Sequence, residues 1–262
     1  MNIGGSPQFH YALEISYDGG NFGGWQSQPD GSGVQDAIEI ALAGLGESCG
    51  TRAVGAGRTD AGVHARAQVA TAKLSKPWPP RRLVLALNAK LPPHVSVMRA
   101  SETLPEFHAR KSAISREYRY FIWNASVCYP HIRPYVLWRP GERFDWGRAA
   151  EAALMLKGAH DFRAFCRKED CPEETLRTVD SSRLIRRGRL LVFRVKSKSF
   201  LTNMVRIMVG NLLEIAAGRR DEAWLANLLT GNFDRTASAA TLPPTGLFLW
   251  RVNYPEKLDW SR

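Results

Sequence analysis

Strand-like and helix-like segments follow one another in a similar order in the two halves of the chain, and this order limits the folds open to it. In the first half, apolar and polar residues alternate over 10–17, as in a half-buried strand. Apolar residues then recur every three or four positions over 34–45, which predicts an amphipathic helix. A strand at 68–74, a helix at 81–87 bracketed by prolines and a strand at 95–100 complete this half.

The second half repeats the mixture with longer segments. We predict strands at 114–123, 178–186, 190–197 and 246–254, and helices at 146–157, 202–217 (ended by Gly218) and 222–229. This β-α-β-β-α-β order predicts an α+β fold of two domains with mostly antiparallel sheets flanked by helices. We expect the boundary near 105–110, with an N-terminal domain over 1–108 and a C-terminal domain over 109–262.

Composition and cysteine content favour a cytoplasmic protein. The 262 residues are 44% hydrophobic and 23% charged, which is typical of globular chains. The apolar stretch 200–217 contains Arg206 and Glu214, so no membrane span is expected, and the first residues lack a signal-peptide pattern. Four scattered cysteines favour free thiols in a reducing compartment. They are Cys49, Cys128, Cys166 and Cys171. Cys166 and Cys171 with His160 lack the second pair that a zinc site needs, so we expect no metal.

Positive charge is concentrated in parts of the chain. The net charge is +11, yet residues 1–50 contain six acids and no Lys or Arg, whereas residues 51–100 contain nine bases and one acid. A second basic run covers 183–198. Lys and Arg release counterions when they bind phosphates, so a polyanionic partner such as nucleic acid is the natural interpretation. A solvated basic surface without a partner would give the same totals.

The single acid of residues 51–100 is Asp60, and it lies in the glycine-rich run GAGRTDAGVHA at 55–65. Glycine and alanine at this density indicate a backbone that turns tightly and approaches another group closely. The Gly-Lys-Ser/Thr ending of a phosphate-binding loop is absent. A structural loop with an exposed Arg58–Asp60 pair is the plain alternative. A solitary carboxylate among cations stays ionised, however, and is then available as a nucleophile.

The chain resembles the tRNA pseudouridine synthase A (TruA-type) family over nearly its whole length. The motifs are YDGGNFGGWQ at 17–26 with Val34–Gln35, GRTDAGVHA at 57–65, Leu87–Asn88 with Leu91–Pro92, FHAR at 107–110, REYRY at 116–120, Phe200–Leu201 with Met204–Arg206, and Gly246–Leu247. Departures are Arg66–Ala67 in place of an apolar-Gly step, Lys111 in place of an aromatic residue, and the segment 241–244.

The resemblance implies the pseudouridine synthase fold, with two domains around a central catalytic cleft. It also implies isomerisation of uridine to pseudouridine at positions 38–40 of the tRNA anticodon stem-loop, without cofactor or metal, by a homodimer. Asp60 matches the family's nucleophile, which assists cleavage of the C1′–N1 bond. The target base must leave the helical stack, at a cost of a few kcal/mol.

Four other residues acquire roles from the resemblance. Tyr118 shares one strand face with Arg116, Tyr120 and Ile122, and the pattern alone favours a half-buried core tyrosine. The resemblance makes Tyr118 the residue that stacks on the flipped uracil. Arg206 lies at the edge of an apolar helix face, as either a surface arginine with a buried stem or a buried cation that needs a carboxylate; the resemblance makes Asp60 its partner.

The remaining two are Arg58 and Leu247. Arg58 resembles the arginine that occupies the space of the flipped base, and Leu247 resembles the apolar residue lining the uracil pocket. His64 and His108 lie in motifs, and we expect structural roles for both. Two alternatives stay open: an RNA-binding module without catalysis, which leaves the acidic loop unexplained, and a Mg²⁺-dependent nucleotide enzyme, which needs further carboxylates and would lose activity in EDTA.

Overall fold

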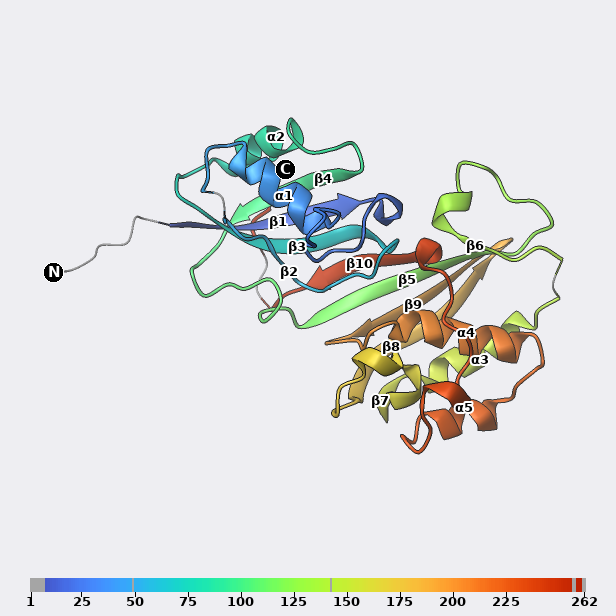
Figure 1. The fold of residues 1–262 in the computed structure, drawn as a ribbon. Helices are drawn as coiled ribbons and strands as arrows, with labels where there is room; N and C mark the ends of the chain where they lie inside the picture. The colour runs from blue at the N-terminus through green and yellow to red at the C-terminus, as the bar shows by residue number, and fades with distance from the viewer. Residues whose placement is uncertain (1–7, 49, 142, 256–257, 261–262) are drawn as a thin grey trace. The chain divides into compact units, whose positions relative to one another are not determined.

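The computed structural model describes residues 8–48, 50–141, 143–255 and 258–260. Their backbone forms ten strands and five α-helices (Figure 1). The chain packs as two compact units: unit 1 is Met1–Ile114 with Leu249–Arg262, and unit 2 is Ser115–Phe248. The domain limits expected from the sequence, 1–108 and 109–262, stay a prediction. The first segment of unit 1 ends six residues later than the expected limit, and the last segment of the chain also belongs to unit 1.

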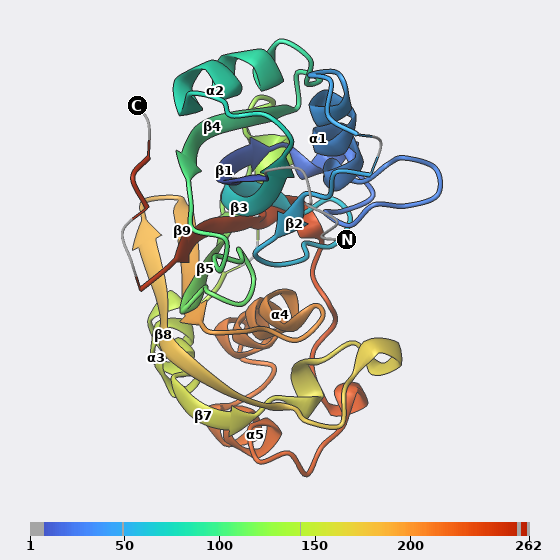
Figure 2. The ribbon, with the colours of Figure 1, turned by 90° about the vertical axis from the view of Figure 1, so that its left-hand side faces the viewer.

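Unit 1 contains an antiparallel part of a ten-stranded sheet, with two helices on one face (Figure 2). Its strands are β1 (Phe9–Tyr17), β2 (Val54–Gly55), β3 (His64–Leu74) and β4 (Val95–Glu102), and its helices are α1 (Val34–Ala43) and α2 (Pro80–Asn88). β1 lies between β3 and β4, and β2 extends the sheet beyond β3. Tyr11, Leu13 and Ile15 alternate along β1 and are fully buried, so this face makes the core of the unit.

The last segment of the chain belongs to unit 1. Strand β10 (Leu247–Asn253) begins at the end of unit 2 and continues into unit 1. There Asn253 accepts a hydrogen bond from the Ile114 amide at 2.9 Å, and the Tyr254 hydroxyl donates to the Ala109 carbonyl at 2.8 Å. The Tyr254 ring also packs on Phe107 with 5.0 Å between centroids. Residues from both ends of the chain therefore build this unit.

Unit 2 contains five further strands of the ten-stranded sheet, again with helices on one face (Figure 1). Its strands are β5 (Ser115–Trp123), β6 (Leu137–Trp138), β7 (Gly158–Asp161), β8 (Leu176–Arg187) and β9 (Leu190–Ser197). Its helices are α3 (Trp146–Met155), α4 (Met204–Ala216) and α5 (Glu222–Leu228). The sheet order is β5-β9-β8-β7, and β6 pairs with β5 as the parallel exception. Tyr120, Phe193 and Val195 are fully buried in its core.

The predicted α+β class with mostly antiparallel pairing is confirmed. Each helix and strand predicted from the sequence is present, with ends that differ by four residues at most. The prediction missed three short strands, β2, β6 and β7. Gly218, with φ at 72°, follows the end of α4 as expected. Among the described residues, no helix combines the length and the apolar character needed to span a bilayer. Cys49 lies outside the described residues.

Candidate active site

Asp60 lies in the loop that joins β2 to β3 in unit 1, and its side chain is half-buried. Its carbonyl accepts a hydrogen bond from the Val63 amide at 3.1 Å, which closes a four-residue turn. Gly62 is the third residue of that turn and has φ at 78°, a conformation that glycine adopts without steric cost. The turn thus fixes the backbone on which the carboxylate is carried. Arg58, two residues earlier, is exposed.

The last residue of β1 and the segment after β1 brace this loop through hydrogen bonds to Thr59. The Tyr17 hydroxyl lies 2.7 Å from the Thr59 hydroxyl, and the Trp25 amide donates to the Thr59 carbonyl at 3.0 Å. Both Tyr17 and Thr59 are buried, and burial raises the pKa of the Tyr17 hydroxyl, so it stays neutral and able to donate. The residue next to Asp60 is therefore held from two sides.

Two glycines of the same segment allow it to approach the loop closely. A Cβ at Gly19 would lie 2.0 Å from the Val63 carbonyl oxygen. A Cβ at Gly24 would lie 2.7 Å from the Thr59 carbonyl oxygen and 3.3 Å from the Asp60 carbonyl carbon, and Gly24 also has φ at 111°. Side chains at these positions would push against the loop. The DGGNFGG run is thus explained by backbone packing beneath Asp60.

His64 and Gln68 hold the loop from the β3 side. Gln68 donates from Nε2 to the Gly57 carbonyl at 2.7 Å. His64 is 1% exposed, and its Nδ1 accepts a hydrogen bond from the Gly19 amide at 3.1 Å and lies 3.1 Å from Asp18 Oδ1. These contacts connect the loop to the segment that braces it. They agree with the structural role expected for His64.

Tyr118 points into the core face of unit 2. It lies on β5 opposite Val195, it is 8% exposed, and the Phe200 ring meets it edge-on with centroids 5.1 Å apart and planes at 82°. Arg116, two residues earlier on the same face, donates from NH1 to the Lys198 carbonyl at 2.6 Å. The predicted face of Arg116, Tyr118, Tyr120 and Ile122 is buried throughout.

Arg206 is held at the first turns of α4 by neutral oxygen atoms. Its Nε donates to the Leu242 carbonyl and its NH1 to Asn203 Oδ1, both at 2.7 Å. Asn203 has φ at 63°, a left-handed conformation that asparagine tolerates better than most residues. The half-buried guanidinium thus obtains polar partners within unit 2. Sequence reasoning missed Asn203 and Leu242, although Asn directly before a helix is a recognisable N-terminal signal.

Leu247 is 5% exposed and begins β10 directly after a 3₁₀ turn at Pro244–Gly246. That turn is fixed by Tyr120, whose hydroxyl donates to the Pro243 carbonyl at 2.7 Å. A Cβ at Gly246 would lie 2.7 Å from the Phe121 carbonyl oxygen. Leu247 is therefore positioned by close packing against β5.

The predicted site residues fall into two groups. Asp60 and Arg58 belong to unit 1, and Tyr118, Arg206 and Leu247 belong to unit 2. Each group has a defined local geometry, and the ion pair between Asp60 and Arg206 stays a prediction. Within the described part of the chain, no cluster of three or more His, Cys, Asp or Glu side chains is arranged to hold a metal ion.

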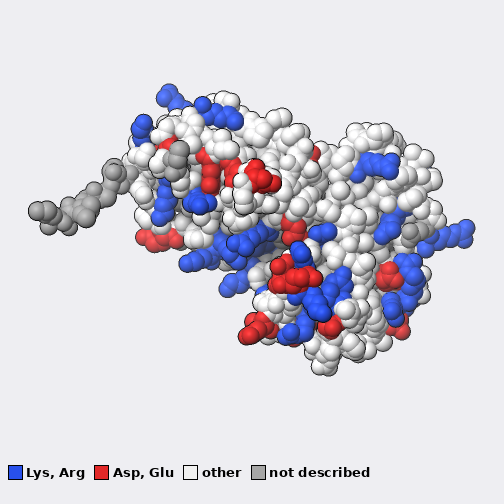
Figure 3. Space-filling model, viewed as in Figure 1, with Lys and Arg blue, Asp and Glu red and all other residues white. Residues whose placement is uncertain are grey.

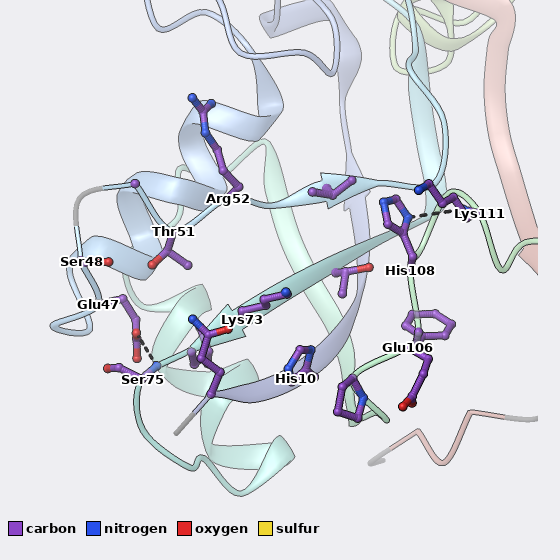
Figure 4. A pocket seen from close by; sticks show the side chains of 17 residues that line it. His10, Glu47, Ser48, Thr51, Arg52, Lys73, Ser75, Glu106, His108 and Lys111 are labelled. Carbon is purple, nitrogen blue, oxygen red and sulfur yellow. Dashed lines mark hydrogen bonds between the residues drawn. The ribbon is translucent and has the colours of Figure 1, made fainter. Parts of the chain in front are cut away.

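A cavity of about 1290 Å³ opens in unit 1 at the end of β3 away from Asp60 (Figure 4). β3 rises about 3.3 Å per residue, so Lys73 in this cavity lies about 30 Å along the strand from His64. His10, Glu47 and His108 also line it, and His108 Nδ1 accepts from the Arg110 amide at 3.1 Å. The cavity is therefore separate from the Asp60 loop.

Two of the three departures from the family pattern lie in unit 1. Lys111 lines this cavity and is exposed. The Arg66 guanidinium lies 5.0 Å from the centre of the Trp250 ring, in a cation–π contact between β3 and β10. Arg66 thus contributes to the attachment of the last strand.

Comparison with known proteins identifies the family of the chain. The family model described as tRNA pseudouridine synthase matches residues 15–110 and 152–255. A protein of Pelobacter propionicus named tRNA pseudouridine synthase A is 41% identical over 92% of this chain and 98% of its own length. One of Mesorhizobium japonicum with the same name is 42% identical over 95% of this chain and 100% of its own. The chain belongs to the tRNA pseudouridine synthase family.

Proposed function

We propose that this protein isomerises uridine to pseudouridine at positions 38–40 of the tRNA anticodon stem-loop, with Asp60 as the nucleophile. Membership of the family makes it an isomerase that acts on tRNA. The observation that supports Asp60 most strongly is its place in the fold. The one carboxylate of residues 51–100 stands on a turn that Tyr17, Gly24 and Gln68 brace from outside.

The proposed chemistry rearranges one bond and needs no co-reactant. The Asp60 carboxylate assists cleavage of the C1′–N1 bond, and the uracil leaves with the bonding electrons. The base rotates so that C5 faces C1′, a C5–C1′ bond forms, C5 loses its proton and N1 gains one. Product and substrate are isomers with the same atoms and electrons, so the proposed reaction includes no cofactor.

Residues of unit 2 assist this step in the proposal. Tyr118 stacks on the flipped uracil, and stacking of a base on an aromatic ring contributes about 1–3 kcal/mol, which is comparable to the cost of unstacking. Arg206 orients Asp60 and keeps it ionised, and its two bonds to Leu242 and Asn203 preset the direction of its guanidinium. Leu247 lines the uracil pocket, and Arg58 occupies the space that the flipped base leaves.

The proposal includes a cytoplasmic homodimer that grips one tRNA across both subunits. A folded tRNA extends beyond the reach of one 29.3 kDa subunit. The chain also separates its charge, because residues 1–50 carry no Lys or Arg. Tight binding of full-length tRNA should then fall steeply with salt, and an isolated anticodon stem-loop should give a shallower dependence.

The decisive experiment replaces Asp60 by Asn, which keeps the shape of the side chain and removes its charge. Asp60→Asn should abolish pseudouridine formation, measured by mass spectrometry of tRNA after pseudouridine-specific derivatisation, while tRNA affinity stays within a few-fold. Asp30→Asn is the matched control, because Asp30 is an exposed turn residue of the same unit and should keep full activity. Turnover by Asp60→Asn above a tenth of the parent rate would contradict the assignment.

A further inference from the structure

Three arginines lie side by side across the sheet of unit 2. Arg119 on β5 stands opposite Arg194 on β9, and Arg194 stands opposite Arg183 on β8. Directly opposed residues of neighbouring strands point to the same face and are about 5 Å apart. We call these three residues the arginine row. The next positions along the same face are Phe121, Val192 and Ile185, so an apolar row runs beside the arginine row.

The arginine row carries more positive charge than its surroundings neutralise. Glu117 bonds Arg119, with 2.7 Å between Oε1 and Nε. The side chains of Arg194 and Arg183 make no hydrogen bond or ion pair with another described residue, and the Arg194 Nε is buried without a partner. Burial and the neighbouring Arg119 lower the pKa of Arg194. Like charges directly opposed in a sheet destabilise it, so the row costs stability unless an anion binds there.

The row lies on the opposite face of the sheet from Tyr118. Tyr118 and Arg119 are successive residues of β5, and successive side chains of a strand point to opposite faces. Tyr118 lies on the core face with the helices, whereas Arg183 and its neighbour Arg187 are exposed. A short RNA hairpin bound at Tyr118 therefore does not reach the row of the same subunit.

Charge is mixed on the face of the molecule shown in Figure 3. On this face, carboxylates lie among the Lys and Arg side chains of both units, and several gather over α1 (Figure 3). Net charge alone therefore does not single out a surface for RNA. The arginine row indicates such a surface, because its three cations lie in one line and the nearby Glu117 carboxylate is already bonded to Arg119.

We propose that the arginine row binds backbone phosphates of the tRNA body, outside the anticodon stem-loop that contains the target uridine. This inference rests on the proposed function. In the proposed homodimer, one tRNA reaches the row of one subunit while its target uridine lies in the site of the other. The opposed guanidinium groups bind successive phosphates, and the apolar row packs against the aliphatic parts of the arginine side chains.

The test uses Arg183→Gln and the double variant Arg183→Gln with Arg194→Gln. The matched control replaces the exposed Arg143, which lies outside both basic runs, by Gln. Each row substitution should reduce the slope of log affinity against log salt by about 1 for full-length tRNA. The double variant should raise the KM for that tRNA about tenfold at unchanged kcat. Kinetics on an isolated anticodon stem-loop should not change, and the control should match the parent.

A stability measurement separates RNA binding from a structural role. Arg194→Met should raise the melting temperature of the free protein, because it removes a buried unpartnered donor and a repulsive neighbour, while it weakens tRNA binding. Unchanged salt slopes would overturn the proposal. A change of oligomeric state in sedimentation would also overturn it and would assign the row to contact between copies. If tRNA treated with the parent protein contains no pseudouridine while the row variants still reduce the salt slope as expected, only the proposed function is contradicted.

Discussion

Replacing Gly24 by Ala tests whether the segment after β1 positions the catalytic loop. The new Cβ would start 2.7 Å from the Thr59 carbonyl oxygen, whereas ordinary van der Waals contact begins at 3.4 Å. The loop must therefore retreat by about 0.7 Å, or the segment must move away from it. Either movement changes the backbone that carries Asp60, since the Asp60 carbonyl carbon lies 3.3 Å from the same Cβ.

The expected magnitude combines strain and displacement. A residue with a side chain held at φ of 111° loses about 1–3 kcal/mol, and the overlap adds to this, so we expect about 2–3 kcal/mol of lost stability. That corresponds to a melting temperature lower by about 5–10 °C. A displacement approaching 1 Å in a catalytic group lowers activity by up to about 10²-fold, so kcat should fall roughly tenfold to a hundredfold.

Gly31→Ala is the matched control for this variant. Gly31 also has positive φ, at 72°, but the space that a Cβ would take there is open, with no neighbouring atom within 4 Å. It should lose about 1 kcal/mol to backbone strain and keep the parent kcat. Thermal unfolding and pseudouridine formation at 25 °C measure both effects on the folded proteins. A kcat for Gly24→Ala within twofold of the Gly31→Ala value would refute the bracing role of this segment.

Three further predictions address other parts of the molecule. Arg206→Met should lower activity strongly and move the acid limb of the pH–rate profile to higher pH; an unchanged profile would mean that Arg206 does not act on Asp60. Hydrogen bonds from Arg148 lower the pKa of Glu222 to about 2, so the stabilisation that this pair provides is present above about pH 4.5 and is lost as the pH falls towards 2. The difference in melting temperature between the parent and Glu222→Gln should therefore be present at pH 7 and disappear near pH 2; a constant difference would contradict it. Burial raises the pKa of the Cys166 thiol to about 12, so iodoacetamide at pH 8 should label Cys171 in the native protein and Cys166 only after unfolding, as peptide mass spectrometry would show.

Long periodic segments of the fold were predictable from sequence, and short strands were not. β5 alternates clearly, and its buried face is the one predicted, whereas α4 is buried at every residue except Arg206 and Glu214. β2 has two residues, so no alternation exists to detect, and it is defined only by pairing with Thr71 and Ala70. β3 begins at His64 and not at 68, because the alanines on both of its faces conceal the alternation at its start.

The chemistry of the site was more predictable than its support. A lone carboxylate in a glycine-rich loop can be recognised in sequence, and so can an arginine at the edge of a helix face. The left-handed Asn203 and the positive φ of Gly24 are set by contacts with residues distant in sequence. The acceptor of the Arg206 Nε, the Leu242 carbonyl, lies 36 positions further along the chain. Such non-local neutral acceptors leave no pattern in the chain.

Unit 1 is assembled from the first and the last parts of the chain, and this imposes an order on its biosynthesis. Residues 115–248 must be translated before Trp250 can meet Arg66 and before Tyr254 can bond Ala109. At about 5–20 residues per second, the nascent N-terminal sheet waits roughly 7–27 s for its final strand. During this interval it is exposed to proteases and chaperones, whereas unit 2 is continuous and can fold as soon as it is released. A ribosome that stalls shortly before residue 249 would therefore release a chain in which the unit that carries Asp60 is incomplete.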